Sequence, residues 1–374
     1  MEKRMEGRLK FLPVLLLILA MIFATAACGG PATEPEGDAE AETETGTEAE
    51  AETSADDLPD FEFSLSLHDP DTSNNGKFMQ AWADEINAKT DGHVTITLFP
   101  SSALATAQDV GDMVETGGVD IGWIYTAYYK GQFPLTDVTT VPMIGFGNAV
   151  STTETLWDLY EKYDEMQAEW KNYKLLNLYG NPGMLFASNK SPIDSADDLA
   201  GRTMRLPAGP ITEYVTALKA SPVTMAPPEL YEALEKNNID SYVFEPAGIT
   251  NFNLQEVTEY FTDLPMYNGA FGLVMNWDKW NALPDEYKAI FEETTQRAGS
   301  MKAANDFEAA ATASREIIAA AGCEWVAVSD ENKAGFQDAA ADIIAAWPAS
   351  IAIDGFDAKA FLDDAIATLK GYSE

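Results

Sequence analysis

The sequence predicts an α/β protein with two lobes, each a mainly parallel sheet flanked by helices. Short apolar runs with strand alternation are separated by stretches with helical spacing, and this order is typical of parallel sheets with helices on both faces. The order occurs twice, over residues 61–124 and again over residues 175–244. The chain has 374 residues, which is long enough for two such lobes.

The first lobe begins with a predicted strand at 61–67, in which aromatic and leucine residues alternate with polar ones. This strand ends at His68, in a loop at its carboxyl end. We expect further strands at 93–99 and 119–124, and helices at 77–88 and 110–114. The last of these strands leads directly into Tyr125 and Tyr128.

The second half of the chain repeats this alternation. We expect strands at 175–179, 184–188, 203–206, 221–225, 239–244, 257–261 and 271–276, and helices at 211–218 and 228–236. The Asn-Pro-Gly segment 181–183 lies where the chain would cross between lobes, and the strand at 271–276 is expected to return to the first lobe. From Pro284 onward, the Ala- and Glu-rich sequence predicts helix, interrupted at 324–328.

These elements divide the chain into four parts. We assign residues 1–27 to a signal peptide, 28–60 to a lipidated cysteine and an acidic disordered tether, 61–181 with 271–312 to the first lobe, and 182–270 with 313–374 to the second lobe and the C-terminal helices.

The N-terminus has the pattern of a bacterial secretory signal. Basic residues precede an apolar run at 11–24 that is shorter than a membrane-spanning helix. Small residues then lead to Cys28, which resembles the lipidated cysteine of a bacterial lipoprotein; ordinary cleavage beside a chance cysteine is the alternative. Residues 29–60 contain no Lys or Arg and nothing to bury, so they should be disordered. We expect an extracytoplasmic protein anchored to the membrane through Cys28.

The formal net charge of −38 argues against two classes of partner. Nucleic acid and anionic lipid surfaces would repel a chain that is this acidic. A small anion is still compatible with it, because the local field at a site matters more than net charge.

Enzyme signatures are absent from the sequence. It contains no Gly-x-Ser-x-Gly, no Walker loop and no Gly-x-Gly-x-x-Gly after a strand. Its two histidines, His68 and His93, cannot make a histidine-rich metal site, and Cys323 has no partner cysteine in the mature chain. We therefore expect no catalytic residue, no metal and no other cofactor.

Arg205 is the main candidate binding residue. Residues 203–206 form a short extended run that Pro207 ends, so the Arg205 guanidinium should lie at the carboxyl end of its strand. In open α/β sheets, ligands bind at this edge, and an arginine there can hold a carboxylate through two parallel hydrogen bonds. The alternative is a surface arginine that balances acidic neighbours.

Seven segments, in their order and spacing, resemble the substrate-binding proteins of tripartite ATP-independent periplasmic (TRAP) transporters, in the carboxylate-binding branch. They are 78–85 (FMQAWADE), 95–100 (TITLFP), 118–123 (GVDIGW), 133–138 (FPLTDV), 195–207 (SADDLAGRTMRLP), 225–234 (MAPPELYEAL) and 254–260 (LQEVTEY). The resemblance covers about residues 61–294. It implies a periplasmic-binding-protein-like fold that closes on an organic acid in the cleft between its lobes and delivers it to a permease driven by an ion gradient.

The resemblance also implies ligand contacts. Arg205 matches the arginine that clamps the ligand carboxylate, and Arg202 matches a position that usually faces solvent. Tyr125 and Tyr128 match contacts from the first lobe to the rest of the ligand. Met184 stands where many members carry a second ligand-facing arginine, which argues against a dicarboxylate or sugar acid.

The second lobe contributes Phe244 and Glu245, which match a loop at the cleft. Several other side chains are expected at strand ends facing the crevice: His68, Trp123, Met184 and Phe186. A pocket of aromatic residues around a single arginine suits a monocarboxylate with an apolar or aromatic body. For Trp123 and Phe186 the alternative is a place in the core between the lobes. Glu245 is expected to hydrogen-bond a ligand hydroxyl or amine, or to pair with Arg205 in the empty site.

Other functions stay open at this point. The same fold could serve an ABC permease or a sensor, and the ligand could be a C4-dicarboxylate. A secreted enzyme is a further alternative, for which Glu245 and His68 are the only candidate pair. We expect a monomer whose partners are a small organic acid, the TRAP permease subunits and, through the lipid anchor, the membrane.

Overall fold

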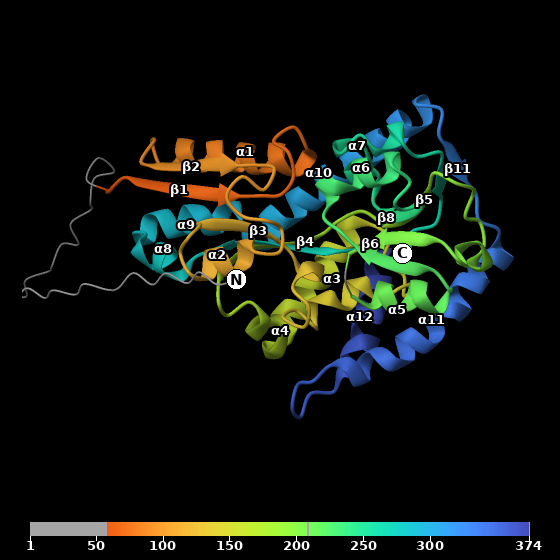
Figure 1. The fold of residues 1–374 in the computed structure, drawn as a ribbon. Coiled ribbons are helices and arrows are strands. Elements are labelled where there is room, and N and C mark those ends of the chain that lie inside the picture. Colours follow the sequence, from red (N-terminus) through yellow and green to blue (C-terminus); the bar gives the residue numbers. More distant parts are fainter. Residues whose placement is uncertain (1–57, 208, 374) are drawn as a thin grey trace, which may run out of the picture. The chain divides into compact units, whose positions relative to one another are not determined.

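The computed structural model of the chain describes residues 58–207 and 209–373. The predicted signal peptide, Cys28 and nearly all of the predicted tether lie outside these residues. Within the described part, the chain forms two mixed sheets with helices packed around them (Figure 1). No helix in this part is long and apolar enough to cross a membrane.

The first sheet has five strands, four of which point the same way. Its order is β2 (Val94–Phe99), β1 (Phe61–Ser66), β3 (Ile121–Tyr125), β10 (Ala270–Met275) and β4 (Lys174–Gly180). β1 pairs in parallel with β2 and β3, and β10 is antiparallel to both of its neighbours. The predicted return of the strand at 271–276 to the first lobe is therefore observed.

The second sheet has six strands and repeats this arrangement. Its order is β11 (Glu324–Val326), β9 (Tyr260–Thr262), β5 (Leu185–Ser188), β8 (Ser241–Phe244), β6 (Thr203–Leu206) and β7 (Ser221–Thr224). Only β5 runs against its neighbours. The predicted α/β class, with mainly parallel sheets, is confirmed. β5 and β10 are inverted because each follows a direct crossing from the other sheet and not a helical crossover.

The two crossings lie side by side and hold each other. Asn181, after β4, donates its backbone N–H to the Gly269 carbonyl at 3.2 Å, and its Oδ1 accepts from the Gly269 N–H at 2.6 Å. Met184 and Tyr267 form an isolated antiparallel bridge beside them. Gly183 has no room for a side chain, because a Cβ there would lie 2.4 Å from Cβ of Pro265. The predicted crossing at 181–183 is thus a tightly packed double connection.

Helices surround both sheets. In chain order they are α1 (Asn74–Lys89), α2 (Val110–Glu115), α3 (Ala149–Lys162), α4 (Asp164–Glu169), α5 (Pro210–Ala217), α6 (Leu230–Glu235), α7 (Pro246–Asn251), α8 (Trp277–Ala282), α9 (Asp285–Thr294), α10 (Gln296–Ala320), α11 (Asp330–Ser350) and α12 (Ala358–Ser373). The long helix α10 packs on β4 and α3 and also on α7, so it braces both lobes (Figure 1).

Helices α3 and α4 were not expected from the sequence. The first turns of α3 are rich in threonine, which has a low helix propensity. Its hydroxyls are satisfied within the helix, because Thr153 donates to the Ala149 carbonyl at 2.7 Å and Thr155 to the Ser151 carbonyl at 2.8 Å. Packing against β4 and α10 stabilises this helix, although the helix propensity of its residues does not predict it.

The C-terminal helices differ from the predicted division of the chain. β11 lies in the second sheet and α11 packs against α5, as an assignment to the second lobe requires. Helix α12, however, packs against α3 beside the first sheet. Its Phe361 is fully buried and stacks on Trp347 of α11, with ring centroids 6.2 Å apart. Residues 313–374 are therefore shared between the lobes, because the apolar face of α12 completes a core that α3 leaves open.

Candidate functional site

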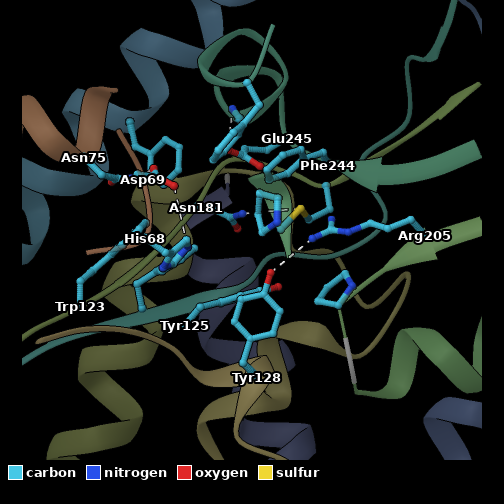
Figure 2. Close-up of a pocket in the computed structure, with 17 residues that line it drawn as sticks. His68, Asp69, Asn75, Trp123, Tyr125, Tyr128, Asn181, Arg205, Phe244 and Glu245 are labelled. Carbon is cyan, nitrogen blue, oxygen red and sulfur yellow. Dashed lines mark hydrogen bonds and ion pairs between the residues drawn. The ribbon is translucent and has the colours of Figure 1, made fainter. Parts of the chain in front are cut away.

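A small cavity lies where the carboxyl ends of strands from both sheets meet (Figure 2). Eight of the nine predicted site residues line it: His68, Trp123, Tyr125, Tyr128, Met184, Arg205, Phe244 and Glu245. The cavity volume is about 30 Å³. This space holds only a few water molecules, so an organic ligand requires its walls to move apart.

Arg205 enters the cavity from β6 and is held by three protein acceptors. Its Nε donates to the Met225 carbonyl at 3.0 Å, Nη1 donates to the Val243 carbonyl at 3.2 Å, and Nη2 donates to the Tyr128 hydroxyl at 3.3 Å. The guanidinium also lies over the Phe244 ring, 5.3 Å from its centroid. These contacts fix the plane of the guanidinium, and they involve both lobes because Tyr128 follows β3 (Figure 2).

The guanidinium is ready to accept an anion. The Arg205 side chain is buried, with 2% of its surface exposed, and no carboxylate of the described residues forms an ion pair with it. A guanidinium has five N–H groups, one on Nε and two on each Nη. One N–H on each Nη therefore remains without a partner from the described chain. A buried cation is stable only when it is paired, so the site favours a ligand that brings a negative charge.

The wall opposite Arg205 is a ladder of aromatic rings. His68 stacks on Trp123 at 4.5 Å between centroids, Trp123 stacks on Phe271 at 4.8 Å, and Phe271 stacks on Tyr125 at 4.7 Å. The pairing of β3 with β10 places these rings on one face of the first sheet. Gly269 keeps the wall compact, because a Cβ there would lie 2.4 Å from the Tyr125 ring. Flat aromatic walls favour an apolar or aromatic ligand body.

Glu245 caps helix α7 and does not pair with Arg205. Its Oε1 accepts from the Gly248 N–H at 2.8 Å, while its Oε2 is buried and has no hydrogen-bond partner among the described residues. Burial raises the pKa of Glu245 to about 8, and Arg205 opposes this shift only in part. The carboxyl is therefore protonated at neutral pH. Of the two alternatives for Glu245, the ion pair with Arg205 in the empty site is not observed, because capping directs this carboxyl to α7.

His68 and Asp69 follow β1 and form the far end of the cavity. Burial, with the Arg205 charge as a smaller cause, lowers the pKa of His68 to about 3, so its ring is neutral. Burial raises the pKa of Asp69 to about 6, although its Oδ2 accepts from the Asn75 amide at 3.0 Å. His68 therefore adds no second cation to the cavity at neutral pH.

Although His68, whose pKa is lowered, destabilises the fold below about pH 6.5, the two buried acids Asp69 and Glu245 predict that the ligand-free chain is more stable at mild acid than at alkaline pH. Their pKa values are higher in the folded chain than in the unfolded chain, so the folded form binds more protons between those values. The stabilisation is complete below about pH 4 and is lost as pH rises through about 6 for Asp69 and about 8 for Glu245. We expect a melting temperature at least about 3 °C higher at pH 5 than at pH 8.5, measured by scanning calorimetry.

The matched control for this prediction is Glu245→Gln, which keeps the side-chain shape and cannot ionise. The difference in melting temperature between pH 5 and pH 8.5 should shrink in this variant. An equal difference in both proteins would contradict the role of Glu245, and a higher melting temperature at pH 8.5 in the unsubstituted chain would contradict the direction.

Two sequence-based expectations about side-chain placement are corrected. Phe186 does not line the cavity: it lies in β5, is fully buried, and faces Phe336 of α11 with ring centroids 6.0 Å apart. Arg202 does not face solvent, since only 5% of its surface is exposed. In a strand, side chains alternate between faces, and the face of β5 that carries Phe186 points into the core of the second lobe.

Several cavity residues were missed by sequence reasoning. The cavity is also lined by Asp69, Asn75, Asn181, Phe252, Phe271 and Phe307, among others. Asp69 directly follows the predicted strand end at His68, so the strand-end argument could have included it. Phe307 comes from α10, far along the chain, and no local pattern indicates that this helix reaches the cavity.

Two α/β lobes around a buried, cation-containing cavity define a protein that binds a small solute by closing on it. The chain belongs to the DctP family, bacterial extracellular solute-binding protein family 7, whose model matches residues 65–349. This is a family of solute-binding receptors that act outside the cytoplasm. The predicted relation to TRAP substrate-binding proteins is confirmed, since solved structures of such proteins share the fold.

Two solved structures and one curated relative illustrate the similarity. A marine-metagenome TRAP solute-binding protein specific for aromatic acids, in complex with 3-hydroxybenzoate, is 25% identical with a TM-score of 0.80, covering 84% of this chain and 100% of that chain. A TRAP protein from Bordetella bronchiseptica with bound mandelate is 26% identical with a TM-score of 0.77, covering 83% and 99%. A monocarboxylate 2-oxoacid-binding periplasmic protein from Nostoc sp. PCC 7120 is 26% identical over 299 residues, which are 76% of this chain and 79% of the relative.

Proposed function

We propose that this chain captures a monocarboxylate with an apolar or aromatic body in the cavity around Arg205. The observation that carries the proposal is a buried guanidinium that faces stacked aromatic rings and has no acid partner among the described residues. The ligand carboxylate takes the free N–H groups of Nη1 and Nη2, which fixes its orientation. Burial of the ligand body against the rings supplies most of the affinity, at about 25 cal/mol per Å² of apolar surface.

The charges around the cavity support one carboxylate on the ligand and not two. Arg205 is the only Lys or Arg among the described residues that line it, and Met184 contributes a thioether where a second arginine would hold a second acid. A second ligand carboxylate would instead meet Asp69, which is mainly ionised at neutral pH because its pKa is about 6. The aromatic acids bound by the metagenome and Bordetella proteins agree with this choice of ligand.

Family membership supports delivery of the captured acid to TRAP permease subunits in the membrane. The family is one of solute-binding receptors, which supports binding without chemistry. The chain is thus proposed to be a receptor that releases its ligand unchanged.

A ligand panel tests the proposal directly. Purified mature chain is incubated with benzoate, phenylacetate, mandelate, succinate and malate, and melting temperature and calorimetric affinity are measured. At least one aromatic monocarboxylate should raise the melting temperature by several degrees and be recovered intact by mass spectrometry. Stabilisation by the dicarboxylates alone would overturn the ligand class, and conversion of the bound acid would overturn the receptor role.

The proposed membrane anchor rests on Cys28, which lies outside the described residues. Cys28→Ala should release the chain from the membrane fraction, because the lipidated thiol would be lost while the folded lobes are unchanged. The measurement is a detergent phase partition followed by an immunoblot, with Cys323→Ala as the matched control. Retention of the Cys28 variant in the detergent phase would contradict the anchor.

A further inference from the structure

The two oxygens of Glu245 have different environments. Oε1 is fixed by the Gly248 N–H at 2.8 Å. Gly248 allows this arrangement because it lacks a side chain: a Cβ there would lie 2.6 Å from Oε1 and 2.6 Å from a carbon of the Phe244 ring. The cap therefore sets the direction of the whole carboxyl group and leaves Oε2 on the cavity side.

Oε2 is the unused atom of this pair. Glu245 has only 3% of its surface exposed, it lines the cavity, and its Oε2 has no hydrogen-bond partner within the described chain. A buried polar atom without a partner is rare in folded proteins and is costly unless a ligand or water satisfies it. Since capping already occupies Oε1, whatever satisfies Oε2 has to come from inside the cavity.

We propose that Oε2 of Glu245 is a second polar subsite, which recognises an oxygen on the body of the ligand and makes hydroxy or oxo monocarboxylates the preferred ligand class. This inference rests on the proposed function, because it concerns the same cavity and takes Arg205 as the site of the carboxylate. The subsite requires an oxygen on the ligand body, which the aromatic walls and Arg205 alone do not require.

The direction of this hydrogen bond follows from the cap. Because Oε1 accepts from the Gly248 N–H, the proton of the neutral acid resides on Oε2, which then donates to a ligand hydroxyl or keto oxygen. Burial keeps the acid neutral by raising its pKa to about 8; Asp69 adds to this shift, while Arg205 opposes it. A ligand ammonium would instead require the ionised carboxylate, so amino acids are expected to bind poorly.

Two variants separate the subsite from the cap. Glu245→Gln keeps an oxygen for the Gly248 N–H and a donor in place of Oε2. Glu245→Asn is also a good N-cap residue, so the helix start is preserved, but its side chain is too short to present a second polar atom to the cavity. Both variants leave Arg205 and the aromatic ladder unchanged.

The experiment compares calorimetric affinities for acids that differ by one group. The probes are mandelate against phenylacetate, phenylpyruvate against 3-phenylpropionate, 3-hydroxybenzoate against benzoate, and phenylglycine as the amino analogue. In the unsubstituted chain and in Glu245→Gln, at least one oxygen-bearing acid should bind about tenfold more tightly than its partner. In Glu245→Asn, the ratio of affinities within each pair should fall to between about one and three, whatever the absolute affinity of the variant.

The outcomes distinguish failure of the Glu245 subsite from failure of the proposed receptor function. Equal binding of both members of every pair, or an oxygen preference that persists in Glu245→Asn, overturns the subsite and leaves the monocarboxylate receptor in place. Tight binding of phenylglycine overturns the neutral donor. Failure of every acid to bind the unsubstituted chain overturns both proposals.

Discussion

Arg205→Ala is expected to lower carboxylate affinity by at least about 100-fold. The ligand would lose two charge-assisted hydrogen bonds, each worth about 1.5–3 kcal/mol, together with the charge that offsets its burial. The aromatic walls would remain, but an anion would then enter a closed cavity that contains Asp69 and Glu245 and no cation. Isothermal calorimetry with the best acid of the panel measures the loss.

The Arg205→Ala variant should still fold. The Met225 and Val243 carbonyls and the Tyr128 hydroxyl lose a donor, but water can enter the enlarged polar cavity and replace it. Removal of a buried, unpaired cation offsets part of this loss. We expect the ligand-free melting temperature to change by less than about 4 °C.

Arg205→Lys is the matched control, because it keeps a positive charge and cannot form the two parallel hydrogen bonds. Its affinity should lie between those of the alanine variant and the unsubstituted chain. Unchanged affinity in Arg205→Ala, with the variant folded, would exclude Arg205 from the ligand site.

The sequence was most informative where a strand ends at the cavity. Pro207 ends β6 and places Arg205 at the sheet edge, and the strand after Asp120 places Trp123 and Tyr125 there. These positions follow from local patterns, because a strand end and a topological edge are both visible in the residues. The same reasoning predicted Phe244 and Glu245 after β8.

The sequence was least informative where tertiary contacts decide a side chain's surroundings. Phe186 has the residue type of a pocket wall, yet the face on which β5 presents it is set by pairing with β8 and β9. The threonine-rich start of α3 lacks a helical signal, and packing determines it. The capping role of Glu245 depends on Gly248, three residues later. The need for a glycine there follows only from the structure, which packs the Phe244 ring against this position.

Arg202 illustrates this limit, because a position expected in solvent proves to be a buried structural residue. Its Nη1 donates to the Ser188 hydroxyl at 2.7 Å, and its Nη2 donates to the Ser191 hydroxyl at 2.8 Å and to the Pro192 carbonyl at 3.0 Å. Its Nε donates to the Asp198 carbonyl at 2.5 Å. The side chain thus joins the loop after β5 to the turn before β6.

Arg202→Met is therefore expected to destabilise the chain by about 3–5 kcal/mol, because the hydrogen bonds of this buried guanidinium to Ser188, Ser191, Pro192 and Asp198 would all be lost. For a domain of this size, we expect the melting temperature to fall by roughly 10 °C in scanning calorimetry. Carboxylate affinity at 15 °C should stay within about threefold of the unsubstituted chain, since Arg202 does not line the cavity.

Arg202 and Arg205 lie three residues apart, and their variants should have opposite effects. Arg205→Ala removes binding and spares stability, because its guanidinium keeps donors free for a ligand. Arg202→Met removes stability and spares binding, because its guanidinium is committed to the chain itself. A fall in affinity without a fall in melting temperature for Arg202→Met would show that the two arginines act in one site. In that case, the number of N–H donors that the fold leaves unused would not distinguish a structural arginine from a ligand-binding one.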